Sequence, residues 1–232
     1  GIILNDNEKV INQGKFGPYI QSERTEIYQK YIKELINNGK AYYCFCSQKR
    51  INKLREDQKE HGLAPKYDKH CSKLSPKEIQ TKLDGGESYV VRLNVNPNEI
   101  IEFTDLIRGK IKINTNDIDD QILLKSDGFP TYHLANVIDD HEMQFTHIIR
   151  GEEWISSTPK HILLYKAFNW EIPKFAHLPL LLNPDRSKLS KRQGDVAVED
   201  YIIKGYLPEA LINYVALLGW NPGDDREIFS MK

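Results

Sequence analysis

The stretch QILLKSDGFPTYHLANVIDD, residues 121–140, decides the fold because a strand pattern, a turn and a helical pattern follow one another in it. Residues 121–125 are apolar enough for a short strand, and residues 126–128 have the composition of a turn. From residue 131 to residue 140 apolar side chains recur at helical spacing, which predicts a helix with one buried face: Leu134, Val137 and Ile138.

The residues that follow repeat this alternation twice. Residues 146–150 and 175–182 predict strands, and residues 159–168 predict the helix between them. Strand, helix, strand, helix, strand is typical of an α/β fold with a parallel sheet, in which ligands bind beyond the carboxyl ends of the strands. We therefore expect residues 150–153 and the loop around Lys188 to face one crevice.

The flanking segments have a different character. Ser22 is the expected N-cap of an amphipathic helix that ends near residue 38. Residues 40–119 alternate short strands with charged helices and predict a small α+β module. After residue 190, two helical patterns at residues 198–204 and 208–218 have no strand between them.

Composition limits the classes of function. The chain has 232 residues, 40% of them hydrophobic, and a formal net charge of −1, so no overall field attracts nucleic acid. Contact with RNA would have to come from local basic patches such as residues 188–192. No window holds eighteen consecutive apolar residues, and a cytoplasmic or organellar-matrix protein without a membrane segment is expected.

The three cysteines surround one charged helix and suggest a zinc site. Cys44 and Cys46 precede the helix and Cys71 follows it, close to Tyr67 and His70. Tetrahedral zinc takes four donors and favours thiolates, so either Tyr67 or His70 could complete the set. The alternative is three unrelated buried thiols.

A second group has the chemistry to bind a small acid. Tyr132 and Asn136 are four residues apart and project from one face of the predicted helix, and Arg150 ends a predicted strand. A guanidinium binds a carboxylate through two parallel hydrogen bonds. The alternatives are a packing role for Tyr132 and a surface ion pair between Arg150 and a neighbouring glutamate. Trp154 is expected in the core or in a pocket wall, and His177 is expected as a hydrogen-bonded core histidine.

The loop DRSKLSKRQG, residues 185–194, follows an apolar run and carries four basic side chains. Lys188 and Lys191 flank Leu189 and Ser190, and ammonium groups on such a loop could neutralise the phosphates of a nucleoside triphosphate. Taken alone, the same loop could simply be solvated.

Four sequence words together resemble bacterial-type glutamyl-tRNA synthetases, which are class I enzymes, over essentially the whole chain. Their order matches that family: GPYIQSER at residues 17–24, DGFPTYHLAN at residues 127–136, IRGEEW at residues 149–154 and KLSKR at residues 188–192.

The resemblance implies a role for each candidate. Residues 188–192 correspond to the second class I signature, with Lys188 and Lys191 as catalytic residues and Ser190 beside them at the ATP phosphates. Glu153 would also lie by the ATP, and Tyr132, Asn136 and Arg150 would line the glutamate pocket. The zinc ligands would be Cys44, Cys46, Tyr67 and Cys71, because Lys73 stands where some members have a histidine.

The resemblance also implies a domain order. Residues 1–39 would end the first Rossmann half, 40–119 would be the inserted module that holds the tRNA acceptor end, and 120–185 would be the second half. Residues 186–232 would hold the signature loop and the start of a helical stem-contact region. The first class I signature is not found in the chain, so we expect a catalytic-region fragment that does not form an adenylate alone.

The implied reaction is ATP-dependent ligation of glutamate to tRNA-Glu through a glutamyl-adenylate, with Mg²⁺ and a structural Zn²⁺, in a monomeric protein. One alternative is a glutamyl-Q tRNA synthetase, a shorter relative with a similar zinc site. Another is a non-catalytic, zinc-stabilised RNA-binding module.

Overall fold

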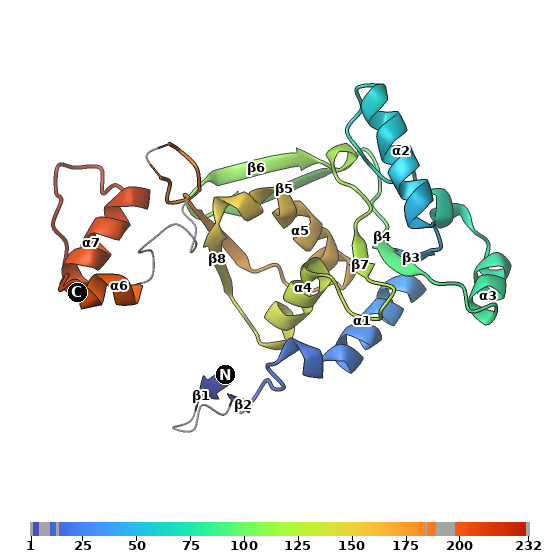
Figure 1. The fold of residues 1–232 in the computed structure, drawn as a ribbon, viewed down its shortest axis with the longest axis horizontal. Helices are drawn as coiled ribbons and strands as arrows, with labels where there is room; N and C mark the ends of the chain where they lie inside the picture. Colours follow the sequence, from blue (N-terminus) through green and yellow to red (C-terminus); the bar gives the residue numbers. More distant parts are fainter. Residues whose placement is uncertain (1, 5–9, 13, 184, 189–197, 231–232) are drawn as a thin grey trace.

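A four-stranded sheet in the order β6-β5-β9-β8 carries Arg150, one of the predicted site residues (Figure 1). The structure is a computed structural model that describes residues 2–4, 10–12, 14–183, 185–188 and 198–230. Strands β8 (His147–Gly151) and β9 (Lys174–Leu178) are parallel over their whole length. Strand β5 (Ile100–Asp105) is parallel to β9 where Asp105 meets Phe175, and β6 (Gly109–Asn114) is its antiparallel edge partner.

The connection between β8 and β9 is the expected α/β unit. A 3-10 helix, η4 (Glu152–Ser157), leads into α5 (Thr158–Ala167), and α5 packs against α4 (Tyr132–Glu142). The buried faces of these helices join the core of the sheet through side chains that are almost fully inaccessible to water: Leu134, Val137, Ile138, Ile162, Leu164 and Phe175. The α/β fold class is therefore confirmed.

The first predicted strand of the alternation has a different partner from the one expected. Strand β7 (Ile122–Leu124) does not join β8 and β9 but pairs antiparallel with β4 (Val90–Leu93), which also pairs with β3 (Ala41–Cys44). A three-residue apolar strand specifies burial but not direction, and here burial is satisfied opposite Val91. The parallel pairing predicted for this strand was wrong.

Two predicted boundaries also shift. Strand β9 ends at Leu178 rather than at residue 182, because Pro179 has no N–H to continue the ladder. Helix α1 (Thr25–Asn37) begins after Arg24 rather than after Ser22, which lies in the 3-10 helix η1 (Gln21–Glu23). The Arg24 guanidinium at the N-cap of α1 is buried and bonded to Asp139 of α4, so the start of α1 is joined to that helix.

The remaining elements lie outside this core, most of them towards one of the two ends of the molecule (Figure 1). Strands β1 (Ile2–Leu4) and β2 (Val10–Asn12) form a hairpin. Around β3 and β4 lie α2 (Gln48–Glu60), η2 (His70–Lys73) and α3 (Pro76–Asp84), while η3 (Thr115–Asp117) follows β6. The predicted C-terminal helices, α6 (Val198–Ile203) and α7 (Pro208–Gly219), are confirmed at the opposite end. None of the helices in the described residues is long and apolar enough to span a membrane.

Candidate active site and metal centre

Arg150, near the end of β8, is the centre of the candidate active site. Its Nε donates to His177 Nε2 at 3.1 Å, its Nη1 donates to His161 Nδ1 at 3.3 Å, and its Nη2 donates to Thr158 Oγ1 at 2.8 Å. These three acceptors come from β9 and α5, so the parallel unit itself orients the guanidinium.

Two histidines close to Arg150 are uncharged. Burial, together with the positive charge of Arg150, lowers the pKa of His161 to about 2. Burial and the charges of Lys160 and Arg150 lower the pKa of His133, whose Nδ1 lies 3.0 Å from His161 Nε2, to about 4. The His161 ring that accepts from Arg150 is therefore neutral, and among the described residues no carboxylate forms an ion pair with the guanidinium.

Trp154 joins Arg150 to Tyr132. The centre of the guanidinium lies 5.9 Å from the Trp154 ring, and the ring of Tyr132 packs against the same indole at 4.6 Å between centroids. Tyr132 is 45% exposed, so its phenol remains accessible to a ligand. Tyr132 and Arg150 thus lie on either side of Trp154. Of the two positions expected for Trp154, the core or the wall of a pocket, this arrangement favours the wall.

Asn136 is linked to Arg150 indirectly, through Asp140. Its amide donates to Asp140 Oδ2 at 2.9 Å, and Asp140 is close enough to Arg150 to feel its charge. Burial, with a contribution from Asp139, nevertheless raises the pKa of Asp140 to about 7. A carboxyl group with a pKa near neutrality is a weaker counter-ion to Arg150 than an ordinary aspartate would be.

A second ion pair joins the two segments expected at the nucleotide. The Lys188 ammonium lies against the Glu153 carboxylate, and this contact lowers the pKa of Glu153. Gly151 makes room for it, since a Cβ at this position would lie 2.1 Å from Glu153 Oε2. Ser190 and Lys191, the other two predicted residues of the loop, lie outside the described residues.

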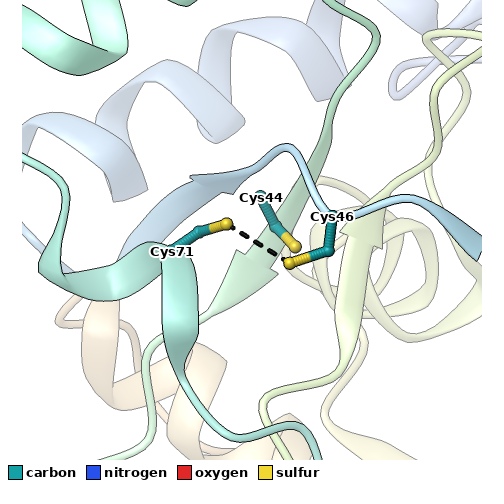
Figure 2. Close-up of side chains that lie close together, drawn as sticks. All are labelled: Cys44, Cys46 and Cys71. Atoms are coloured by element: carbon teal, nitrogen blue, oxygen red, sulfur yellow. Dashed lines mark hydrogen bonds between the residues drawn. The ribbon is translucent and has the colours of Figure 1, made fainter. Parts of the chain in front are cut away.

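The three cysteines converge between β3 and η2, as Figure 2 shows. Their Sγ atoms all lie within 4.8 Å of one another, and Cys46 Sγ is 3.5 Å from Cys71 Sγ. That separation is much longer than a disulfide bond and close to the edge of a tetrahedron of thiolates around zinc. Hydrogen bonds from Cys71 and Tyr67 lower the pKa of the Cys44 thiol, so the cluster favours a thiolate.

Tyr67 is the fourth group of this cluster. Its phenol oxygen lies 3.3 Å from both Cys44 Sγ and Cys46 Sγ and accepts a hydrogen bond from the Cys71 backbone N–H. His70, the other candidate, is exposed and does not join the cluster of ligand atoms among the described residues. The donor set therefore fits zinc, with Tyr67 in the place of the fourth ligand.

Sequence reasoning did not identify the residues that hold Arg150. Thr158 and His161 lie on α5, eight and eleven residues after Arg150, and Asp105 lies on β5 behind His177. His177 was expected to be a satisfied core histidine, and it is fully buried and hydrogen-bonded. No local motif marks Asp105, because only the order of strands brings β5 beside β9.

Comparison with known proteins gives a consistent result. The model of the catalytic domain of class I tRNA synthetases (E and Q) matches residues 3–232. The chain is 58% identical over 232 residues to a glutamate–tRNA ligase of Clostridioides difficile and 57% identical over 231 residues to one of Alkaliphilus metalliredigens. It covers 47% of each of these proteins and is itself fully covered, so it spans about half the length of the curated relatives.

Solved structures extend the comparison to three dimensions. A glutamate tRNA ligase from Elizabethkingia meningosepticum, solved in complex with its amino acid, aligns with a TM-score of 0.81 and 42% identity. The alignment covers 94% of this chain and 48% of that one. The parallel unit that holds Arg150, the matched family model and these relatives agree: the chain belongs to the catalytic domain family of the class I tRNA synthetases for glutamate and glutamine.

Proposed function

We propose that the full-length protein containing this chain is a glutamate–tRNA ligase, which activates glutamate with ATP and transfers it from the adenylate to tRNA-Glu. One observation supports this most directly. Arg150 is fixed by three hydrogen-bond acceptors, lacks an ion pair among the described residues and lies beside the exposed Tyr132. A guanidinium that is fixed in place and has no carboxylate in direct contact is suited to bind a substrate carboxylate. The curated relatives are named glutamate–tRNA ligases, which favours glutamate as that substrate.

In the proposed site, Tyr132, Asn136 and Arg150 bind glutamate. Asn136 uses its NH₂ group to bind Asp140, and no donor among the described residues takes its amide oxygen. That oxygen could accept a hydrogen bond from an ammonium group, and the Tyr132 hydroxyl could donate or accept one. Arg150 would bind one carboxylate of the substrate.

The proposed nucleotide residues are Glu153, Lys188, Ser190 and Lys191. Lys188 and Lys191 would neutralise charge on the ATP phosphates during in-line attack by the glutamate carboxylate on the α-phosphate, and pyrophosphate would leave. Mg²⁺ would accompany the ATP. The Lys188–Glu153 contact supports this assignment, because it brings the loop to the end of β8 where Arg150 lies.

Zinc would stabilise the region that we propose to bind the tRNA acceptor end, within residues 40–119. Cys44, Cys46, Tyr67 and Cys71 would hold the ion, and its role would be structural because these four donors fill a tetrahedral site. Residues 1–39, 120–185 and 186–232 would be the end of the first Rossmann half, the second half, and the signature loop with the stem-contact helices. We further propose a monomer in the cytoplasm.

The test is aminoacylation of tRNA-Glu by the full-length protein. Wild-type protein should attach glutamate and reject glutamine, and Arg150→Ala should raise the KM for glutamate about 100-fold or more, as expected for loss of a charged hydrogen-bonding group. Lys166→Ala, an exposed basic residue of α5, is the matched control and should have no effect. Transfer of glutamate to queuosine-modified tRNA, but not to the 3′ end of tRNA-Glu, would contradict the proposal.

A further inference from the structure

A buried carboxylate lies directly behind the residues that hold Arg150. Asp105 and His177 have no solvent-exposed side-chain surface, and Asp105 Oδ2 lies 2.6 Å from His177 Nδ1. Burial alone would raise the pKa of Asp105, but hydrogen bonds from His177 and from the backbone N–H groups of Arg108 and Ile107 lower it below its usual range. Asp105 is therefore an acceptor, and His177 Nδ1 carries the hydrogen.

The opposite nitrogen of the same ring must then be free of hydrogen. Arg150 Nε can only donate, and it lies 3.1 Å from His177 Nε2. Thr158 Oγ1 is 3.2 Å from the same nitrogen. A hydrogen on Nε2 would point at the N–H of Arg150 and break the contact that fixes the guanidinium, so the tautomer of His177 decides how Arg150 is held.

The number of N–H groups that Arg150 already uses shows why its contact with His177 matters. A guanidinium has five N–H groups, and three of them are used by His177, His161 and Thr158. No acceptor among the described residues takes the other two, one on each terminal nitrogen. A pair of this kind can bind both oxygens of a carboxylate only while the plane of the guanidinium is held still.

We infer that Asp105 and His177 are positioning residues for the amino-acid substrate: Asp105 holds His177 as the Nδ1–H tautomer, and His177 Nε2 aims Arg150 at the substrate carboxylate. The identity of that carboxylate as glutamate rests on the function proposed above. The positioning itself rests only on the contacts from Asp105 to Arg150.

The orientation of Asp105 makes one substitution especially informative. Its Oδ1 accepts the backbone N–H groups of Ile107 at 3.0 Å, Arg108 at 2.9 Å and His177 at 3.3 Å. In Asp105→Asn the amide oxygen must keep this place, so the NH₂ group faces His177 Nδ1. Nδ1 must then accept, the hydrogen moves to Nε2, and two donors meet between His177 and Arg150.

A second substitution, His177→Gln, gives Arg150 an acceptor that has no tautomers. The amide oxygen of a glutamine side chain at this position reaches about as far as Nε2 of histidine and accepts from Arg150 without help from Asp105. His177→Gln should therefore keep the KM for glutamate within about threefold of the wild type. In this background Asp105→Asn should have little further effect on that KM.

The experiment measures the tautomer and the kinetics separately on the full-length protein. Two-bond ¹H–¹⁵N spectra of histidine-labelled protein should show His177 with hydrogen on Nδ1 in the wild type and on Nε2 in Asp105→Asn. In aminoacylation, Asp105→Asn should raise the KM for glutamate about tenfold or more and leave the KM for ATP within about twofold. Asp224→Asn, in which Oδ1 also accepts a backbone N–H, is the control and should change neither KM.

The outcomes separate the two proposals. Hydrogen on Nε2 in the wild type, or an equal loss from Asp105→Asn in the wild-type and His177→Gln backgrounds, would overturn the positioning role. If the tautomers behave as expected but the wild type does not ligate glutamate, the positioning of Arg150 is supported and the proposed substrate is wrong. Because the wild-type spectrum alone decides the tautomer, the inference remains testable even if Asp105→Asn does not fold.

Discussion

The Lys188 ammonium, on the loop after β9, lies against the Glu153 carboxylate, on the 3-10 helix that follows β8. Both side chains are partly exposed, at 57% for Lys188 and 33% for Glu153. An exposed pair contributes little to stability, so its place at the ends of two parallel strands is more informative than its energy.

Removal of the Lys188 ammonium should slow the reaction more than it weakens glutamate binding. We expect Lys188→Ala to lower kcat about 100-fold with the KM for glutamate nearly unchanged, since the charge acts where negative charge develops on phosphate. Steady-state aminoacylation by the full-length protein measures both constants. A large rise in the KM for glutamate with an unchanged kcat would place Lys188 at the amino acid instead.

Gly151 should be needed for the position of Glu153. In Gly151→Ala the new Cβ would lie 2.1 Å from Glu153 Oε2, so that carboxylate must move away from Lys188. We expect the KM for ATP to rise about fivefold. The same change made in a Glu153→Ala protein should have no further effect, because the displaced group is already gone. An undiminished effect there would mean that Gly151 acts on the backbone and not through Glu153.

The sequence predicted the parts of this site that lie close together along the chain. Tyr132 and Asn136 share a helix, Arg150 lies at the end of one strand and Glu153 follows it, so periodicity and strand order were sufficient for them. Asp105 and the antiparallel partner of β7 could not be predicted in the same way. Their positions depend on which strands lie side by side, and short apolar strands do not encode the identity or direction of a neighbour.

Zinc content should depend on all three cysteines and on Tyr67. Purified protein should contain about one zinc per chain, and the Cys44→Ser, Cys46→Ser double variant should contain almost none. Tyr67→Phe should weaken the retention of zinc against a chelator, whereas His70→Ala, which changes an exposed neighbour, should not. If Tyr67→Phe and His70→Ala lost zinc to the chelator equally, the assignment of Tyr67 as the fourth ligand would be wrong.

The ion pair between Arg24 and Asp139 should be among the most sensitive contacts outside the site. Arg24 is 1% exposed, its Nε donates to Asp139 Oδ1 at 2.7 Å, and the Tyr28 hydroxyl donates to the same carboxylate. Asp139→Ala leaves a buried guanidinium without its partner and should lower the free energy of unfolding by about 3–5 kcal/mol. Glu102→Ala breaks the exposed pair with Lys112 and, as the control, should have a much smaller effect on the free energy of unfolding. Denaturant titration measures the free energy of unfolding of both variants. Similar losses from Asp139→Ala and Glu102→Ala would mean that the buried ion pair is no more important than the exposed one.

The free energy of unfolding should fall as the pH is lowered from 7 to 5. Two histidines near Arg150 should steepen this fall, and one buried carboxyl group should oppose it. In the folded protein the pKa of His161 is about 2 and that of His133 is about 4, against an ordinary value of 6.5. Below pH 6.5 the unfolded chain therefore binds protons that the folded chain does not, and stability is lost. The pKa of Asp140 is raised to about 7, so between its ordinary value of 3.8 and pH 7 the folded chain holds an extra proton and stability is gained.

The two contributions can be separated by substitution. His161→Leu should flatten the loss of stability between pH 6.5 and 5 by roughly 1 kcal/mol per pH unit, because part of the proton uptake on unfolding is removed. Asp140→Asn should make the same loss steeper, because the carboxyl group that gains stability on acidification is gone. Denaturant midpoints at pH 5, 6 and 7 measure both slopes. If the two variants changed the slope in the same direction, one of these groups would not have, in the folded protein, the protonation state that its burial favours.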